Sequence, residues 1–174
     1  ISGTIYPGSG TINLSASEDM PAGKWVVINA PNATVRITSS LHYTSAALTS
    51  VQSIPQLIII AQNIVIQDNV DTVDAWLLAK GTGANGTLTT CDASITEPTQ
   101  LTASVCSTKL TINGPVIANH VNLYRTAGSG TGTASGDPAE VFNLRPDAYM
   151  WASNFSGLES KARTVYQTEL PPRF

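Results

Sequence analysis

The sequence predicts a mainly β protein, a short right-handed parallel β-solenoid, from two observations. First, the phrase Val-Ile-Asn-Ala-Pro at residues 27–31 returns as Thr-Ile-Asn-Gly-Pro at residues 111–115, with a looser copy at residues 59–63. With residues 82–108 set aside as an inserted loop, the last two copies lie about 25 residues apart, close to one solenoid coil. Second, short Val- and Ile-rich segments alternate with turn residues. The alternative is that two Ile-Asn turns resemble each other by chance.

Three parts of the chain differ in composition. We expect a solenoid domain over residues 1–126 and a linker rich in Gly, Ser and Thr over residues 127–136. Residues 137–174 then form a C-terminal segment of helix and strand. Its aromatic side chains need cover, so we expect this segment to pack on the solenoid.

The first 24 residues contain frequent Gly and Pro, which predicts an irregular first coil with a short strand at residues 11–14. The strands expected after it cover residues 25–29, 34–38, 57–61, 64–67, 73–80, 109–113 and 121–125. Residues 57–60 are apolar throughout, which indicates a strand covered on both faces. In residues 121–125, alternation places Val121 and Leu123 on one face and Tyr124 on the other.

The C-terminal segment carries two start signals. Asp137-Pro138 followed by Glu140 predicts a short helix through Asn143, with Asp as the N-cap and Pro at the first helical position. Pro146 prevents simple continuation and begins a second turn of helix or a strand. Residues 164–170 alternate like an edge strand before two prolines end it.

Composition excludes several function classes. Charged residues make up 12% of the 174 residues, well below the roughly 25% of ordinary domains, and 21 Thr and 17 Ser give a hydroxylated surface. The net charge is −3 and the nine Lys and Arg are scattered, so nucleic acid is not an expected partner. The longest apolar run is far shorter than the ~18 residues of a membrane span. We expect no span in this segment.

The two cysteines, Cys91 and Cys106, bracket a polar segment. A zinc site is excluded because it needs about four ligands and neither histidine lies near the pair. The remaining interpretations are a disulfide or two buried thiols. A disulfide closing this loop contributes about 3 kcal/mol in the chain-entropy model, and it predicts an oxidising, extracellular or cell-surface location.

One acidic cluster contains Asp68, Asp71 and Asp74. The interleaved Asn69 and Thr72 favour a turn in which the side chains bond their own backbone. The alternatives are a calcium site, or the acid and base of a polysaccharide-cleaving β-helix. We expect neither a cofactor nor a resident metal.

Two aromatic residues, Trp76 and Tyr124, alternate with expected core positions. Each is therefore a candidate for stacking on the sugar rings of a glycan. The alternative is that both pack beneath the C-terminal segment.

The last part of the chain resembles a family of surface proteins. The matching residues are Asp-Pro-Ala-Glu-Val-Phe-Asn-Leu-Arg at 137–145, Asp-Ala-Tyr at 147–149 and Glu-Leu-Pro-Pro-Arg-Phe at 169–174. With residues 112–115 and 124–125, they are similar to secreted β-helical surface proteins of Saccharibacteria-like candidate-phylum bacteria. This resemblance implies an extracellular β-helical region and a surface role. It carries over no catalytic residue.

The sequence therefore favours a non-enzymatic structural or adhesive domain of a cell-surface protein. Its expected partners are a surface glycan, another protein or a further copy of the chain. One alternative is a carbohydrate-active β-helix enzyme or glycan-binding module, which needs carboxylates converging in a cleft. Another is a filament subunit, which needs uncapped apolar terminal coils.

Overall fold

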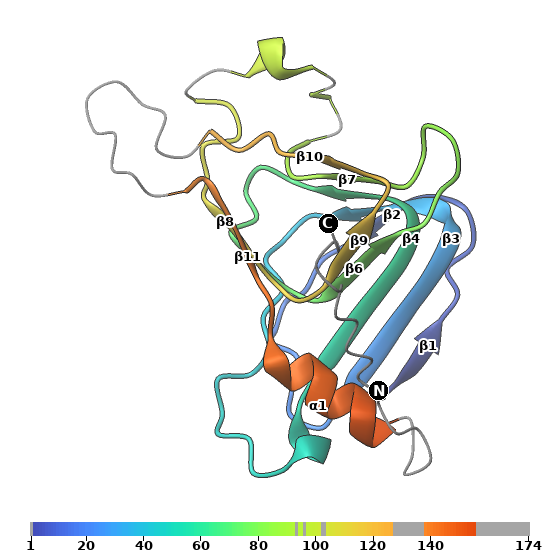
Figure 1. The fold of residues 1–174 in the computed structure, drawn as a ribbon, viewed down its shortest axis with the longest axis vertical. Coiled ribbons are helices and arrows are strands. Elements are labelled where there is room, and N and C mark those ends of the chain that lie inside the picture. Colours follow the sequence, from blue (N-terminus) through green and yellow to red (C-terminus); the bar gives the residue numbers. More distant parts are fainter. Residues whose placement is uncertain (1, 93, 96, 102–103, 127–137, 156–174) are drawn as a thin grey trace, which may run out of the picture.

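The computed structural model describes residues 2–92, 94–95, 97–101, 104–126 and 138–155. Within these ranges the fold is mainly β, with two sheets and one α-helix (Figure 1). The helix, α1 (Pro146–Phe155), follows the last strand. Two single-turn 3-10 helices lie in loops, η1 (Val51–Ser53) and η2 (Pro98–Gln100). The predicted mainly β class is confirmed.

All strands pair in parallel. The larger sheet contains β1 (Gly3–Ile5), β2 (Gly10–Leu14), β3 (Trp25–Ile37), β4 (Gln56–Ile66), β6 (Trp76–Ala79), β7 (Thr87–Thr89), β9 (Val116–Ala118) and β10 (His120–Asn122). The smaller sheet contains β5 (Thr72–Asp74), β8 (Leu110–Asn113) and β11 (Glu140–Asn143). Parallel partners need a long connection, so each strand pairs with one from another pass of the chain.

The long strands β3 and β4 form the centre of the larger sheet. They pair from Trp25 opposite Gln56 to Ile37 opposite Ile66, with an irregularity after Ala30. Strand β4 then pairs with β6 along its first half and with β7 along its second. The order β1-β3-β4-β6-β9 places β9 at one end of the sheet.

Side-chain alternation builds one apolar interior. In β4, Leu57 and Ile59 are buried, whereas Ile58 and Ile60 are only half-buried. The buried face of β4 belongs to the same cluster as Ile112 of the smaller sheet. Because both sheets contribute to this cluster, they pack around a shared core. The expected full cover on both faces of residues 57–60 is wrong, since the outward side chains keep partial exposure.

The repeated phrase does not mark equivalent positions. Residues 27–31 lie in β3 of the larger sheet, whereas residues 111–115 begin in β8 of the smaller one. The looser copy does lie in β4, but Ile58 rather than Ile59 stands opposite Val27. A one-residue shift exchanges the two faces of a strand. The turn expected at the end of each copy is also wrong for the first two, since residues 27–31 and 59–63 lie inside the continuous strands β3 and β4. The recurrence therefore reflects shared strand-forming residues, not register.

Two expected boundaries change. The interpretation of residues 82–108 as an inserted loop is wrong because β7 lies within it and pairs with β4 and β10. The strand expected over residues 73–80 is divided at Ala75 into β5 and β6, which belong to different sheets. The next pass of the chain turns at Gly114, where an added Cβ would lie 2.1 Å from the Ala75 carbonyl oxygen. Only glycine allows these two corners to stack so closely.

The helix predicted from Asp137-Pro138 is wrong in its described part. Residues Glu140–Asn143 form β11, with Phe142 opposite Ile112. Pairing with β8 overrides the local start signal, as tertiary context commonly does. The same Pro-first chemistry does begin α1, at Pro146.

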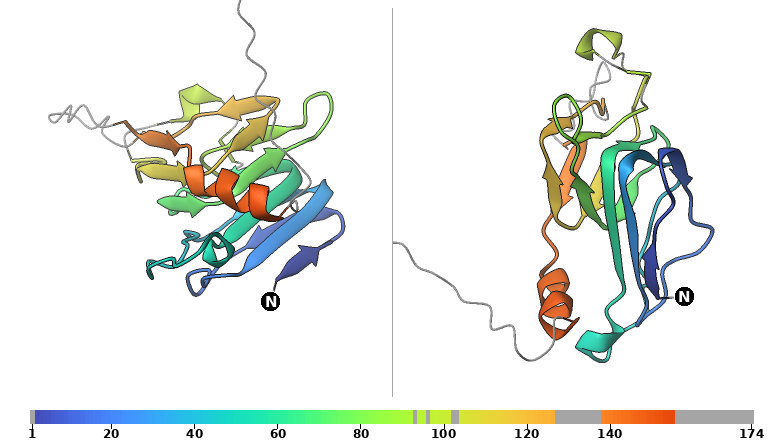
Figure 2. Two further views of the ribbon diagram at one scale, coloured as in Figure 1. Left: turned by 60° about the horizontal axis from the view of Figure 1, so that its bottom comes forward. Right: turned by 90° about the vertical axis from the view of Figure 1, so that its right-hand side faces the viewer.

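Helix α1 packs beside η1, as Figures 1 and 2 show. Ala148 and Trp151 are buried, and the Gln52 side-chain amide donates to Asn154 Oδ1 at 3.1 Å. The described part of the C-terminal segment thus packs against the sheet region. The linker at 127–136 and the strand expected at 164–170 lie outside the described residues.

The strand expected over residues 121–125 is shorter and has the opposite exposure. Strand β10 ends at Asn122, and Val121 and Leu123 are exposed while Tyr124 is buried. Val121 stands opposite the buried Leu88, but β10 pairs only with β7. The side chains do alternate in exposure along this segment. Which of them are covered depends on the position of β10 at the end of its sheet, and the sequence pattern does not give that position.

Candidate functional site

Two of the three cluster aspartates, Asp68 and Asp71, contact residues distant in sequence. The Asp68 backbone carbonyl accepts from Arg125 Nη1 at 2.6 Å. The Asp71 carboxylate accepts from Ser40 Oγ at 2.8 Å, and this hydrogen bond lowers the pKa of Asp71. Ser40 Oγ in turn accepts from the Asp71 N–H at 3.1 Å. The Ser40 contacts link the segment after β4 to the preceding pass of the chain, and the Arg125 contact links it to a later one.

The third aspartate, Asp74, starts a polar row across the smaller sheet. Its side chain is buried, with Oδ2 accepting from the Tyr43 N–H at 2.7 Å and Oδ1 from the Asn113 amide at 2.8 Å. Asn143 then donates to Asn113 Oδ1 at 2.9 Å. Asp74, Asn113 and Asn143 stand in register on β5, β8 and β11. The buried carboxylate therefore fastens three successive passes.

Arg145 closes this corner. Its Nη1 lies 3.7 Å from Asp74 Oδ2, and its Nε donates to Asp147 Oδ1 at 3.1 Å. The guanidinium carbon lies 5.0 Å from the centroid of the Tyr43 ring, a cation–π distance. The Tyr43 hydroxyl accepts from the Leu57 N–H at 2.7 Å, and burial raises the pKa of Tyr43. Each polar group here already has a structural partner.

A cavity of about 430 Å³ adjoins the Asp74 corner, within the usual range of small-ligand sites. Its walls include inward-facing side chains of the sheets, such as Ile28 and Leu57, and the polar side chains Asp74 and His42. Among the described residues, the buried side-chain polar atoms without a partner belong to Arg36 and Gln56, and neither lines this cavity. The cavity thus opens from the apolar interior to exposed polar residues, among them Glu18, Asp19 and Lys24, and its lining supplies no buried side-chain polar atom without a partner.

The acidic side chains do not assemble a metal site in the ranges that the structure describes. No group of three or more His, Cys, Asp or Glu side chains lies there in a metal-binding arrangement. The Asp71 and Asp74 carboxylates instead have separate partners, and the contact given above for Asp68 is made by its backbone carbonyl. The catalytic interpretation finds no geometric support in these contacts.

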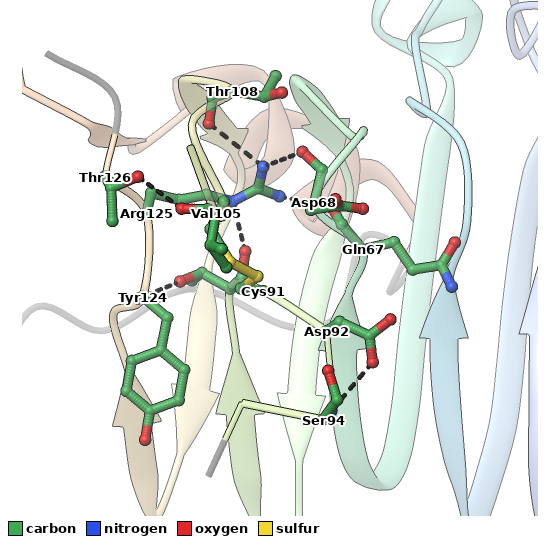
Figure 3. The surroundings of a disulfide bond; sticks show 12 residues. Gln67, Asp68, Cys91, Asp92, Ser94, Val105, Thr108, Tyr124, Arg125 and Thr126 are labelled. Atoms are coloured by element: carbon green, nitrogen blue, oxygen red, sulfur yellow. Dashed lines mark hydrogen bonds between the residues drawn. A yellow bond between two sulfur atoms is a disulfide. The ribbon is translucent and has the colours of Figure 1, made fainter. Parts of the chain in front are cut away.

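Arg125 forms a second polar centre, shown in Figure 3. Its side chain is buried and donates from Nε to Thr90 O, from Nη2 to Gln67 O at 2.6 Å, and from Nη1 to Asp68 O and Thr108 O at 2.6 and 3.2 Å. These carbonyls come from three segments distant in sequence. Burial lowers the pKa of Arg125, although arginine stays charged at any ordinary pH. One guanidinium thus ties together three connections between strands.

Cys91 and Cys106 form the predicted disulfide, with their Cα atoms 5.9 Å apart (Figure 3). The two cysteines belong to a small apolar cluster, against which Ile95, Leu101 and Val105 pack. Tyr124 belongs to this cluster and is 7% exposed, so its ring offers almost no surface for stacking on a sugar.

Trp76 is half-buried on the outer face of the larger sheet. Its indole Nε1 donates to the Gln56 side-chain carbonyl at 2.7 Å. This bond fixes the ring against a buried neighbour, while the uncovered part of the ring remains available for contact.

No family model, curated protein or solved structure matches this chain. No helix in the described parts of the chain is long and apolar enough to cross a membrane.

Arg125, Arg145 and Tyr43 were missed by sequence reasoning. Each is a single polar residue without a motif, and each has a partner far away along the chain, such as Asp74 for Tyr43 and for Arg145. The only available signal was chemical: a scarce charged residue inside a Val- and Ile-rich region needs a partner if it is buried. The presence of such a charged residue does not show which residue its partner is.

Proposed function

We propose that the chain is a parallel β-solenoid that acts as a non-enzymatic structural or adhesive module of an extracellular surface protein. The observation that carries this proposal is the use of Asp74, the most buried acidic candidate, as a structural hydrogen-bond acceptor between successive passes. A general base needs a free lone pair aimed at a substrate. Asp74 instead accepts from Tyr43 and Asn113 and lies beside Arg145.

The order of strands supports the solenoid. The chain crosses the smaller sheet at β5 between β4 and β6, and again at β8 between β7 and β9. Isolated parallel bridges, Leu41 with Val73 and Met20 with Tyr43, continue the smaller sheet toward the first passes. A chain that alternates between two parallel sheets around one core winds as a coil.

The disulfide and the low content of charged residues support an extracellular setting. The resemblance to secreted bacterial surface proteins agrees with this proposal. As an adhesive module, the chain would contact a surface glycan or protein through its outer faces, with the partly exposed Trp76 as the aromatic candidate.

The test is an assay of the full chain for cleavage and binding of polysaccharides. Neutral, amino-sugar and uronic-acid polymers are incubated with the protein, and new reducing ends are measured beside an Asp74→Asn variant. We expect no new reducing ends from either protein. Cleavage by the wild type that is lost in Asp74→Asn, with the fold retained by circular dichroism, would overturn the non-enzymatic assignment.

Binding to the same polymers separates the two remaining roles. Retention on a polymer that falls in Trp76→Ala identifies the adhesive form of the proposal. Absence of retention excludes these polymers as the adhesive ligand and leaves a protein contact or a structural role.

A further inference from the structure

The second halves of β3 and β4, together with β7 and β10, carry an outer surface made largely of hydroxyl and amide side chains. Ile64 and Leu88, which pair across β4 and β7, belong to the shared core. Because side chains alternate along a strand, the residues beside them point outward. This outward surface, the β7 face, consists of Thr34, Asn63, Val65, Thr87, Thr89 and Asn122.

A groove of about 360 Å³ lies on the β7 face. All six residues of the face line it, together with Ala84 and Ile95. Ala84 belongs to the connection between β6 and β7, and Ile95 belongs to the loop closed by the disulfide, which projects from the sheet (Figure 1). The groove therefore has a floor of four strands and walls supplied by two loops, and its volume suits a small ligand.

Contacts within the protein hold both walls of the groove in place. The Asn63 side-chain amide donates to Asn85 Oδ1 at 3.1 Å, and the Asn119 side-chain amide donates to the Gly81 carbonyl at 2.7 Å. On the other side, Ile95 packs against the apolar cluster of the disulfide. A site formed before the ligand arrives loses less conformational entropy on binding.

Polar groups in and beside the groove keep hydrogen-bonding capacity. The Thr34 hydroxyl has no hydrogen-bond partner among the described residues. Thr89 Oγ1 accepts only a long contact of 3.5 Å from the Asn122 amide. Arg36 stands opposite Val65 in register at the border of the groove, and its buried Nε has no partner. A ligand that both donates and accepts hydrogen bonds would satisfy these groups.

The chemistry of the groove fits an uncharged sugar. Its described lining contains no ionisable side chain, and the neighbouring Arg36 is paired with Asp92 at 3.9 Å, so the site carries no net charge. Sugar hydroxyls donate and accept hydrogen bonds, as Thr and Asn side chains do. The apolar side chains of Val65 and Ile95 suit the C–H groups of a sugar ring. Neighbouring strands lie about 4.8 Å apart, close to the length of one pyranose residue in an extended polymer.

We propose that this groove binds a segment of a neutral polysaccharide, which crosses the strands from Thr34 toward Asn122. The inference rests on the proposed adhesive role and gives that role a site on the β7 face. This site does not include Trp76, which lies on β6 and does not line the groove.

The test is an NMR titration of the full chain with three neutral probes: cellotetraose, N-acetylated chitotetraose and β-1,4-mannotetraose. We expect at least one probe to shift the amide signals of Thr87, Thr89 and Asn122. Thr34→Val/Thr87→Val removes two hydroxyls at nearly constant side-chain shape and should weaken binding about tenfold. Thr111→Val, on β8 of the smaller sheet, is the matched control and should leave the affinity unchanged.

Several outcomes would overturn the proposal. They are the absence of shifts in the groove with all three probes, an affinity unchanged in Thr34→Val/Thr87→Val, and equal weakening by Thr111→Val. Tighter binding of tetragalacturonate than of every neutral probe would overturn the assignment to an uncharged sugar.

Failure of the groove and failure of the proposed function give different results. Shifts confined to the surroundings of Trp76 would overturn the groove but keep the adhesive role. Cleavage of a probe bound in the groove would overturn the non-enzymatic role but keep the groove as the binding site.

Discussion

Two arginine-centred corners hold this fold together by different chemistry. Arg125 is almost fully buried and binds only backbone carbonyls through its side chain. Arg145 is about 29% exposed and binds carboxylates and an aromatic ring. The first corner joins connections between strands, and the second joins helix α1 to the smaller sheet. Substitution of Arg125 should therefore destabilise the whole fold, whereas substitution of Arg145 should destabilise only helix α1 and its surroundings.

The two substitutions differ in how many buried hydrogen-bond acceptors they leave without a donor. Without Arg125, several carbonyls within the fold lose a charged donor, and unsatisfied buried acceptors cost about 1–3 kcal/mol each. Without Arg145, Asp74 keeps two donors, from Tyr43 and Asn113. The Asp74 carboxylate therefore stays hydrogen-bonded when Arg145 is removed, and the loss of stability is smaller.

The largest effect is expected from Arg125→Lys. A single ammonium cannot reach carbonyls in three segments, so we expect a loss of about 3–4 kcal/mol in the free energy of unfolding. The melting temperature should fall by about 6–16 °C in differential scanning calorimetry. Arg36→Lys is the matched control, because Arg36 makes only a 3.9 Å ion pair with Asp92. Equal losses in both variants would contradict the special role of Arg125.

Removal of the disulfide comes second. Cys91→Ser/Cys106→Ser frees a loop of sequence separation 15, which costs about 3 kcal/mol in the chain-entropy model. The loop should become the first region to exchange amide hydrogens, while β4 keeps its protection. Chemical reduction of the wild type should lower its denaturant midpoint by the same amount as the double substitution does. A midpoint unchanged by reduction would show that the apolar cluster alone holds the loop.

Arg145→Met tests the second corner. It removes the contacts with Asp74 and the Tyr43 ring but keeps most of the apolar stem, and we expect a loss of about 1–2 kcal/mol. Exchange should accelerate in α1, at Ala148 above all, with β4 unaffected. Asp147→Asn keeps the Arg145 contacts with Asp74 and Tyr43 and should give a smaller change. Uniform acceleration throughout the sheets would mean that this corner is as global as that of Arg125.

The smallest effect concerns Asp71, which lies outside both corners. The Ser40 hydrogen bond lowers its pKa, so NMR titration should find it below the ordinary value of about 3.9. A lowered pKa in the folded state stabilises the protein above about pH 4, and this contribution disappears as the pH falls through the lowered pKa. Ser40→Ala should raise the pKa of Asp71. An unchanged value would assign the shift to other neighbours.

Local chemistry in the sequence predicted several elements. The β-branched runs identified where β3 and β4 lie, because such side chains favour a pleated, half-buried backbone. The expected division of each into two short strands was wrong, since β3 and β4 are continuous. The spacing of Cys91 and Cys106 predicted the disulfide. The helix or strand expected to begin at Pro146 is a helix, whereas the helix predicted from Asp137-Pro138 is wrong. The recurring phrase suggested the strand-and-turn pattern but not the register. Register depends on partners that the phrase does not specify.

By itself the sequence determined the mainly β class and the covalent brace, since each depends on residues close together or on paired cysteines. Only the structure showed that the short strands expected at residues 25–29 and 34–38, and at 57–61 and 64–67, join into the long strands β3 and β4. Only the tertiary structure decided that Glu140–Asn143 is a strand, because β8 offered it a partner. The burial of Tyr124 and the four-carbonyl site of Arg125 were decided in the same way. Folding brings the partners of these residues together from distant parts of the chain. Local conformational preferences depend on neighbouring residues and therefore do not specify these contacts.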